Sequence, residues 1–269
     1  MLMNHWLLIV VSFVVLNGLS LTAQDKPDEK VELEELRLAR AQVGIFRVTN
    51  AETDEDIERI EHPLLSYTDP AREISNGTLW AWGRKGRPVA VGELFMHSNR
   101  NQKFWVQAFH ATDETRLKMT APDRATWTPR RSDLYFQSFV GAPAPAEIAV
   151  ARLQQMKAFA QKFSAHQFWG PENSRLELRL LAEPVHRYDD AEKGIVDGAI
   201  FIVALGMNPE ATLFIEAAKD KDQAAANWRF GIGRSSQSEL VILYDGKEVY
   251  HELWIPFQQQ TNNPVWLVN

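Results

Sequence analysis

The sequence predicts an α+β protein in which a mostly antiparallel β-sheet packs against one long amphipathic helix. Short apolar runs separated by Gly, Pro, Asn and Asp recur along the chain and give about eleven short strand candidates in two blocks. Short turns between these runs favour antiparallel pairing. A single long segment, near residues 145–165, has apolar residues at helical spacing, so we expect one helix on a sheet face.

The N-terminal residues predict a leader followed by a tether. Residues 6–16 form an apolar run, and no charged side chain occurs before Gln24, which is typical of a secretory signal peptide over residues 1–23. The alternative is an uncleaved membrane anchor, although the run is shorter than the ~20 apolar residues of a typical span. Residues 24–45 predict a charged helix or tether, and residues 51–60 a second short helix.

Residues 46–269 are predicted to form a single α+β domain. Its first block of expected strands covers residues 78–82, 88–97, 104–112 and 134–140. Its second block covers residues 175–181, 199–205, 212–215, 228–232, 240–244 and 247–254. The run over 199–205 is continuously apolar, which predicts a central strand. Asp245-Gly246 suits the positive φ angles of a tight hairpin turn.

The expected helix lies between the two blocks. Pro143 and Pro145 favour a helix start. One apolar stripe follows at spacings of three and four residues, formed by Ala149, Leu153, Met156, Ala160 and Phe163. This stripe is the face that we expect to cover the sheet.

A weak internal repeat places one similar segment on each side of this helix. Gly77 begins an apolar run, a Gly-bounded turn and a strand that reaches Glu93. Gly198 begins a similar series that reaches Glu216. Two related sheet halves would give such a repeat, but so would any two hairpins, and hairpin signals are common. We interpret the repeat as chance similarity.

Several segments resemble a family of uncharacterised exported proteins from planctomycete-type bacteria. The resemblance covers roughly residues 75–255. It is carried by Gly77-Thr-Leu-Trp-Ala-Trp-Gly83, by Leu176 to Tyr188 (LELRLLAEPVHRY), by Asp197-Gly-Ala-Ile-Phe-Ile-Val203, by Asn208-Pro-Glu210 and by Phe214-Ile-Glu-Ala217. It implies export from a bacterium, periplasmic or secreted, and it implies no activity and no catalytic residues.

Composition excludes several function classes. The net charge of −6 gives no electrostatic case for nucleic acid or for an anionic membrane surface. The chain has no cysteine, so disulfides, thiolate catalysis and a Cys-linked lipid are impossible. Gly231-x-Gly233 lacks the third glycine and helix of a dinucleotide loop, and no zinc-ligand or Gly-x-Ser-x-Gly spacing occurs. We expect no cofactor and no resident metal, and the partners stay unknown.

Histidine and carboxylate side chains give one candidate catalytic site. On the strand opened by Pro88, Glu93 and His97 share a face. His110 and the nearby Asp113 end the following strand, so pairing of the two strands brings all four toward one sheet end. Such a group suits acid–base or metal chemistry, but the alternative is that they are separate polar residues at wet strand ends.

Aromatic residues give the second candidate site. Trp80 and Trp82 point to one face of their strand and form either a ligand-stacking platform or part of the core, and the core interpretation is favoured. Residues 183–188 place His186 and Tyr188 on a Pro-interrupted strand with polar residues along one rim, which suits ligand contact.

These observations favour a non-catalytic, exported module that binds a ligand or partner through a sheet face. The first alternative is a secreted hydrolase or metal-dependent enzyme that uses Glu93, His97, His110 and Asp113. The second is a structural role in which the helix within residues 24–45 docks to a larger assembly.

Overall fold

The computed structural model describes residues 29–99, 102–169, 174–219, 225–255 and 261–268. The predicted signal peptide over residues 1–23, and the membrane anchor that is its alternative, lie outside the described residues. Within the described ranges, no helix is long and apolar enough to span a membrane.

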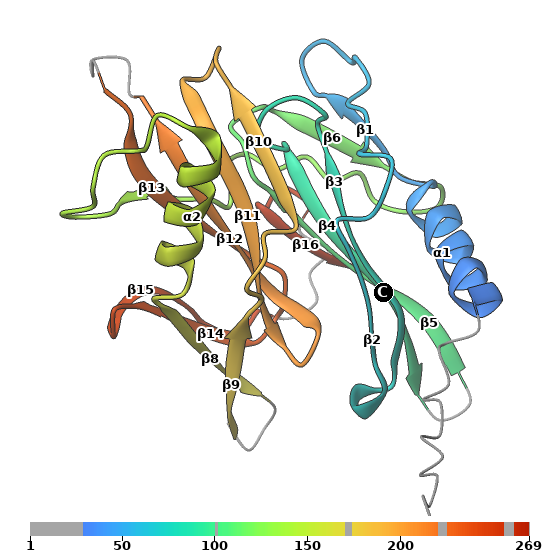
Figure 1. The fold of residues 1–269 in the computed structure, drawn as a ribbon. Coiled ribbons are helices and arrows are strands. Elements are labelled where there is room, and N and C mark those ends of the chain that lie inside the picture. Colours follow the sequence, from blue (N-terminus) through green and yellow to red (C-terminus); the bar gives the residue numbers. More distant parts are fainter. Residues whose placement is uncertain (1–28, 100–101, 170–173, 220–224, 256–260, 269) are drawn as a thin grey trace, which may run out of the picture.

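The predicted α+β class is wrong, because the described chain is mostly β. It contains two short α-helices, one 3-10 helix and sixteen strands, named β1 to β16 in chain order (Figure 1). The prediction of antiparallel pairing is confirmed, since every strand pair in the described residues is antiparallel. Short turns between apolar segments therefore set the sheet direction as expected.

The smaller main sheet has five strands in the order β16-β5-β4-β3-β2. Its bounds are β2 Leu65–Asp69, β3 Ile74–Trp82, β4 Ala90–Asn99, β5 Gln102–Ala111 and β16 Val265–Val268. The 3-10 helix η1, Pro70–Arg72, links β2 to β3. A separate two-stranded ribbon pairs β1, Arg47–Asn50, with β6, Leu117–Thr120.

The larger sheet has nine strands and is strongly curled (Figure 1). Its order is β15-β14-β8-β9-β11-β12-β13-β7, with β10 also paired to β11. Its bounds are β7 Gln137–Ser138, β8 Phe163–Trp169, β9 Ser174–Leu180, β10 His186–Asp190, β11 Ile195–Leu205, β12 Asn208–Ala218, β13 Asn227–Arg234, β14 Glu239–Tyr244 and β15 Lys247–Glu252.

The inner faces of the two sheets pack against each other. Leu79 and Val91 of the smaller sheet share a buried cluster with Ile200, Ile202 and Phe214 of the larger one. The alternate residues of β11, such as Phe201, belong to a second cluster on the outer face of the larger sheet. Strand β11 is thus buried on both faces, which confirms the central position predicted from its continuous apolar run.

The N-terminal helix α1, Glu29–Val43, covers the outer face of the smaller sheet (Figure 1). Ala39 and Val43 are buried, and Val43 belongs to a cluster with Trp80 and Trp82 of β3. The helix predicted within residues 24–45 is confirmed over these bounds. Because it buries part of the core, it is not merely a tether.

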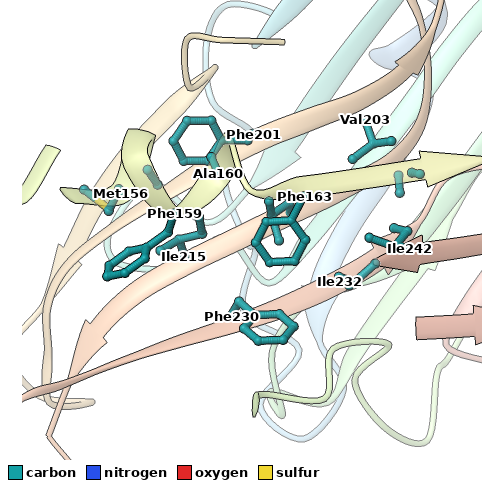
Figure 2. Packing of buried hydrophobic residues seen from close by; sticks show 14 of the residues in the cluster. Met156, Phe159, Ala160, Phe163, Phe201, Val203, Ile215, Phe230, Ile232 and Ile242 are labelled. Atoms are coloured by element: carbon teal, nitrogen blue, oxygen red, sulfur yellow. The ribbon is translucent and has the colours of Figure 1, made fainter. Parts of the chain in front are cut away.

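The helix predicted near 145–165 is much shorter than expected. Helix α2 spans Ala149–Ala160, and Phe163 already begins strand β8. Met156, Phe159 and Ala160 face the outer cluster of the larger sheet, and Phe163 joins the same cluster from the strand (Figure 2). Pairing of β8 with both β14 and β9 satisfies backbone groups that a longer helix would satisfy internally, and this tertiary pairing overrides the helical spacing.

Two further local predictions are wrong. Residues 51–60 form turns and isolated bridges, because the Asn50 side chain accepts backbone hydrogen bonds from Glu52 and Thr53 and so stabilises a turn. Of the strand predicted over 134–140, only the two residues of β7 are paired. The Asp245-Gly246 turn is confirmed, with φ angles of 48° and 76°.

Candidate functional site

Two parts of the chain repeat the same local architecture. In the smaller sheet, Tyr67 of β2 lies opposite Gly77 of β3, with a register shift before the next pair, Asp69 and Ile74. In the larger sheet, Tyr188 of β10 lies opposite Gly198 of β11, with the same shift before Asp190 and Ile195. The spacing between all partners is identical. These shared contacts favour two related halves over the chance similarity inferred from the sequence.

The glycines in this repeat are required by close packing. A Cβ on Gly77 would lie 2.4 Å from the Tyr67 ring, and a Cβ on Gly198 would lie 2.6 Å from the Tyr188 ring. Each tyrosine ring therefore packs directly on the glycine backbone of the neighbouring strand. The Tyr67 hydroxyl contacts the buried Glu93 of β4, and the Tyr188 hydroxyl contacts the buried Glu216 of β12. The result is one Tyr–Glu pair in each half.

The Tyr188–Glu216 pair is closed by cations. Arg87 donates two hydrogen bonds to Glu216, at 2.7 and 3.0 Å, and Arg229 donates to the same carboxylate at 2.9 Å. Both guanidinium groups lie 4.5 Å from the centre of the Phe136 ring. The Glu216 side chain is fully buried, so its charge is compensated inside the protein.

The Tyr67–Glu93 pair has a different neighbourhood. The Tyr67 hydroxyl contacts the Glu93 carboxyl and also lies 2.7 Å from Oδ1 of Asn208. A phenol carries one proton, so it donates to only one of these two oxygens. If Asn208 accepts that proton, the contact with Glu93 requires a neutral Glu93 carboxyl that donates to the phenol oxygen. Burial, which raises the pKa of Glu93, favours this arrangement with a protonated glutamate.

A cavity of about 560 Å³ opens between the two sheets beside this pair. Its walls are mainly apolar and come from Ile74, Phe95, Phe104, Val106, Ala108, Trp169, Leu176, Pro209 and Leu267. Polar side chains complete the lining, namely Arg72, Glu93, His97, Gln167, Asn208, Glu210, Ser235, Ser236 and Gln237. The volume falls in the range of sites that hold drug-sized molecules.

Charge at the polar part of the cavity is only partly compensated. Arg72 donates to Glu210 at 3.1 Å and lies 3.7 Å from Asp69. Burial, reinforced by the charge of Glu210, raises the pKa of Glu93 well above its usual value, although the Tyr67 hydrogen bond and Arg72 oppose this shift. Burial also raises the pKa of Glu210, against the effects of Arg72, Ser236 and Gln167.

Four buried polar atoms of the lining have no hydrogen-bond partner among the described residues, namely Oε1 of Gln167, Oγ of Ser235, Oγ of Ser236 and Oε1 of Gln237. Gln167 and Ser235 are the most buried of the four residues, at 1% and 4% exposed. A buried polar atom without a partner costs free energy. Such atoms beside a cavity therefore indicate that a ligand or water binds there and forms hydrogen bonds with them.

The predicted quartet of Glu93, His97, His110 and Asp113 is divided by the structure. Glu93 and His97 both line the cavity. His110 is buried farther along β5 with its Nε2 atom 2.9 Å from the Thr212 hydroxyl, and burial lowers its pKa to about 3. Asp113 accepts hydrogen bonds from Arg87 and from Lys193, which lies in the other half of the chain. The last two residues are therefore absent from the cavity lining.

The aromatic candidates also lie away from the cavity. Trp80 and Trp82 are buried in the cluster under α1, which confirms the core interpretation that the sequence favoured. Tyr188 belongs to the closed pair with Glu216, and the His186 ring lies 6.0 Å from the Tyr188 ring. Neither residue lines the cavity.

Sequence reasoning missed most of the site, including Tyr67, Arg72, Asn208 and Glu210. A signal was present, because Tyr67-x-Asp69 with Ile74-x-Asn76-Gly77 matches Tyr188-x-Asp190 with Ile195-x-Asp197-Gly198 at identical spacing. Alignment of the two segments would have identified both Tyr–Gly contacts. It would not have identified the cavity, since that depends on how the two sheets face each other.

Comparison with known proteins adds no assignment. No family model, no curated protein and no solved structure matches this chain. The resemblance to exported planctomycete proteins stays a prediction. Within the described part of the chain, no group of three or more His, Asp or Glu side chains is arranged to hold a metal ion.

Proposed function

We propose that this chain is an exported, non-catalytic binding protein for a small, mainly apolar molecule that carries a hydrogen-bonding group. The cavity between the sheets is the observation that carries the proposal. Its walls suit an apolar body, which gains free energy by leaving water. Its polar part supplies the few hydrogen bonds that orient a ligand.

The orphaned polar atoms support binding rather than a purely structural void. Gln167 Oε1 and Ser235 Oγ are buried without partners in the described residues, and both residues line the cavity. A ligand or water that pairs with them would remove the cost of leaving them unsatisfied. An empty structural cavity would instead be lined by apolar groups alone.

The enzyme alternative has less support. Of its four residues, Asp113 is held by Arg87 and Lys193, and His110 is placed against Thr212. Only Glu93 and His97 remain beside the cavity. A binding site needs only the residues that line the cavity, whereas the proposed enzyme needs His110 and Asp113 as well. The binding function is therefore the simpler explanation of this cavity.

Titration of the purified protein with decanol by isothermal titration calorimetry tests the proposal. We expect saturable binding to the wild type, and at least a tenfold loss of affinity in Val106→Trp, which fills the cavity from β5. Thr68→Trp adds the same ring at an exposed position of β2 and is the matched control. The proposal is wrong if the wild type binds no apolar probe, or if both variants bind as the wild type does.

A further inference from the structure

The two Tyr–Glu pairs differ in one chemical respect that indicates what the cavity takes. Glu216 contacts two guanidinium groups, those of Arg87 and Arg229. Glu93 contacts the Tyr67 hydroxyl, and across the described residues no cationic side chain forms a hydrogen bond or ion pair with it. One copy of the pair therefore has its cations built in, and the other has none.

The missing cation corresponds to a definite position on the neighbouring strand. Arg229 of β13 lies directly opposite Glu216 of β12. In the other half, Ala108 of β5 lies directly opposite Glu93 of β4, and it lines the cavity. The larger sheet thus has Arg229 opposite its glutamate, whereas the smaller sheet has the methyl group of Ala108 and the cavity opposite Glu93.

The second cation of the Tyr188–Glu216 pair also has no counterpart beside Glu93. Arg87 lies in the turn between β3 and β4 and crosses to Glu216 of the larger sheet. Asn208, the first residue of β12, crosses to Tyr67 of the smaller sheet. The residue that crosses to the Tyr67–Glu93 pair is thus an uncharged amide that bonds the tyrosine, so Glu93 lacks both positive charges.

The remaining charges of the lining do not supply a substitute. Arg72 is engaged by Glu210, with Asp69 next to it. Glu93 and Glu210 thus share one nearby cation between two buried carboxyl groups. A negative end group would meet two buried carboxyl groups and a cation that Glu210 already engages, whereas a positive end group would meet a carboxyl that becomes its counter-ion on losing its proton.

We propose that the natural ligand carries a protonated amine or a guanidinium group, and that this cation lies against Glu93 with the apolar body along the β4 and β5 wall. The proposal rests on the function proposed above. On binding, Glu93 releases its proton to solvent and becomes a carboxylate that accepts hydrogen bonds from the ligand. The free Oε1 atom of Gln167 is a further acceptor within the lining.

A series of three probes with one chain length tests the charge preference. Decylamine, decanol and decanoate are titrated into the wild type at pH 7. We expect decylamine to bind at least tenfold more tightly than decanol, because hydrogen bonds between ionised groups are about twice as strong as neutral ones. We expect decanoate to bind most weakly. Equal binding of amine and alcohol, or tightest binding of decanoate, overturns this inference while leaving the proposed function intact.

Binding of none of the three probes overturns both proposals at once. Glu93→Gln, a variant of nearly the same shape, is expected to lose the preference for decylamine over decanol. If this variant fails to fold, the comparison of the three probes on the wild-type protein still tests the inference.

A graft from the other half gives an independent test. Ala108→Arg places a guanidinium opposite Glu93, as Arg229 is placed opposite Glu216, and should abolish decylamine binding. Ala108→Met adds similar length without charge, so it should weaken all probes but keep the amine ahead of the alcohol. An Ala108→Arg protein that still prefers decylamine contradicts the inference.

Discussion

The two Tyr–Glu pairs show how one local architecture buries charge in two ways. In the larger sheet, Glu216 is neutralised by Arg87 and Arg229, so an ion-pair network is sealed inside the protein. In the smaller sheet, Glu93 fits a neutral carboxyl, and His110 on the adjacent strand is also buried in its neutral form. One half buries compensated ions, and the other buries titratable groups without their charges.

Under the proposed function, this difference separates a structural pair from a ligand-binding pair. Glu216 already accepts hydrogen bonds from Tyr188, Arg87 and Arg229, so its charge is compensated without a ligand. A neutral Glu93 beside the cavity can lose its proton and pair with a cationic ligand. The predictions below test this contrast through stability, beginning with the largest expected effect.

Removal of one cation from the sealed pair should cause the largest loss. Arg87→Met leaves Glu216 and Asp113 with reduced compensation in a buried setting, and breaking such a pair costs roughly 3–5 kcal/mol. Urea unfolding of the variant and wild type at pH 7 measures this change. A loss below about 1 kcal/mol would show that the network is not a closed structural unit.

Acid should weaken the neutral half through His110. The pKa of His110 is lowered by burial from 6.5 to about 3, so between these values the unfolded chain binds a proton that the folded chain does not. Stability is therefore lost as pH falls below 6.5, by up to about 2–3 kcal/mol near pH 4.5. His110→Gln should remove this part of the acid dependence when unfolding free energies are measured by urea titration at pH 6.5 and at pH 4.5. An unchanged dependence would place the effect on other groups.

Alkali should weaken the same half through Glu93. The pKa of Glu93 is raised by burial, so its contribution to stability is complete below the usual value of 4.5 and declines as pH rises toward the folded pKa. Glu93→Gln should lack this decline in urea unfolding measured from pH 5 to 8. The ionisable groups that face Glu93 are Tyr67, Arg72 and Glu210. Parallel unfolding curves for variant and wild type from pH 5 to 8 would show that Glu93 is already ionised.

Periodicity in the sequence predicted the antiparallel pairing and the central strand, but not the fold class. Alternation and turn residues are local signals, and Asp245-Gly246 forms its hairpin as expected because only the local φ angles matter. The helix near 145–165 was predicted too long because Phe163 suits both a helical stripe and a strand face. Pairing of β8 with β9 and β14, which are distant in sequence, decided for the strand.

The candidate site was predicted only at Glu93 and His97, for a similar reason. Strand pairing placed the two residues on one face, and the face of a strand can be read from alternation alone. The contacts of His110 with Thr212 and of Asp113 with Lys193 connect opposite halves of the chain. Nothing in the local pattern indicates which half a side chain will meet.

The sequence by itself determined the antiparallel direction in which the strands pair, the central strand over residues 199–205, and a repeated Tyr–Gly motif whose identical spacing is visible in the residues. Only the tertiary structure decided that one glutamate meets two arginines while the other meets an alanine and a cavity. The physical reason is the distance along the chain over which each effect acts. Turn formation and side-chain alternation depend on a few neighbouring residues. Burial, charge compensation and cavity volume depend on which surfaces from distant parts of the chain pack against each other.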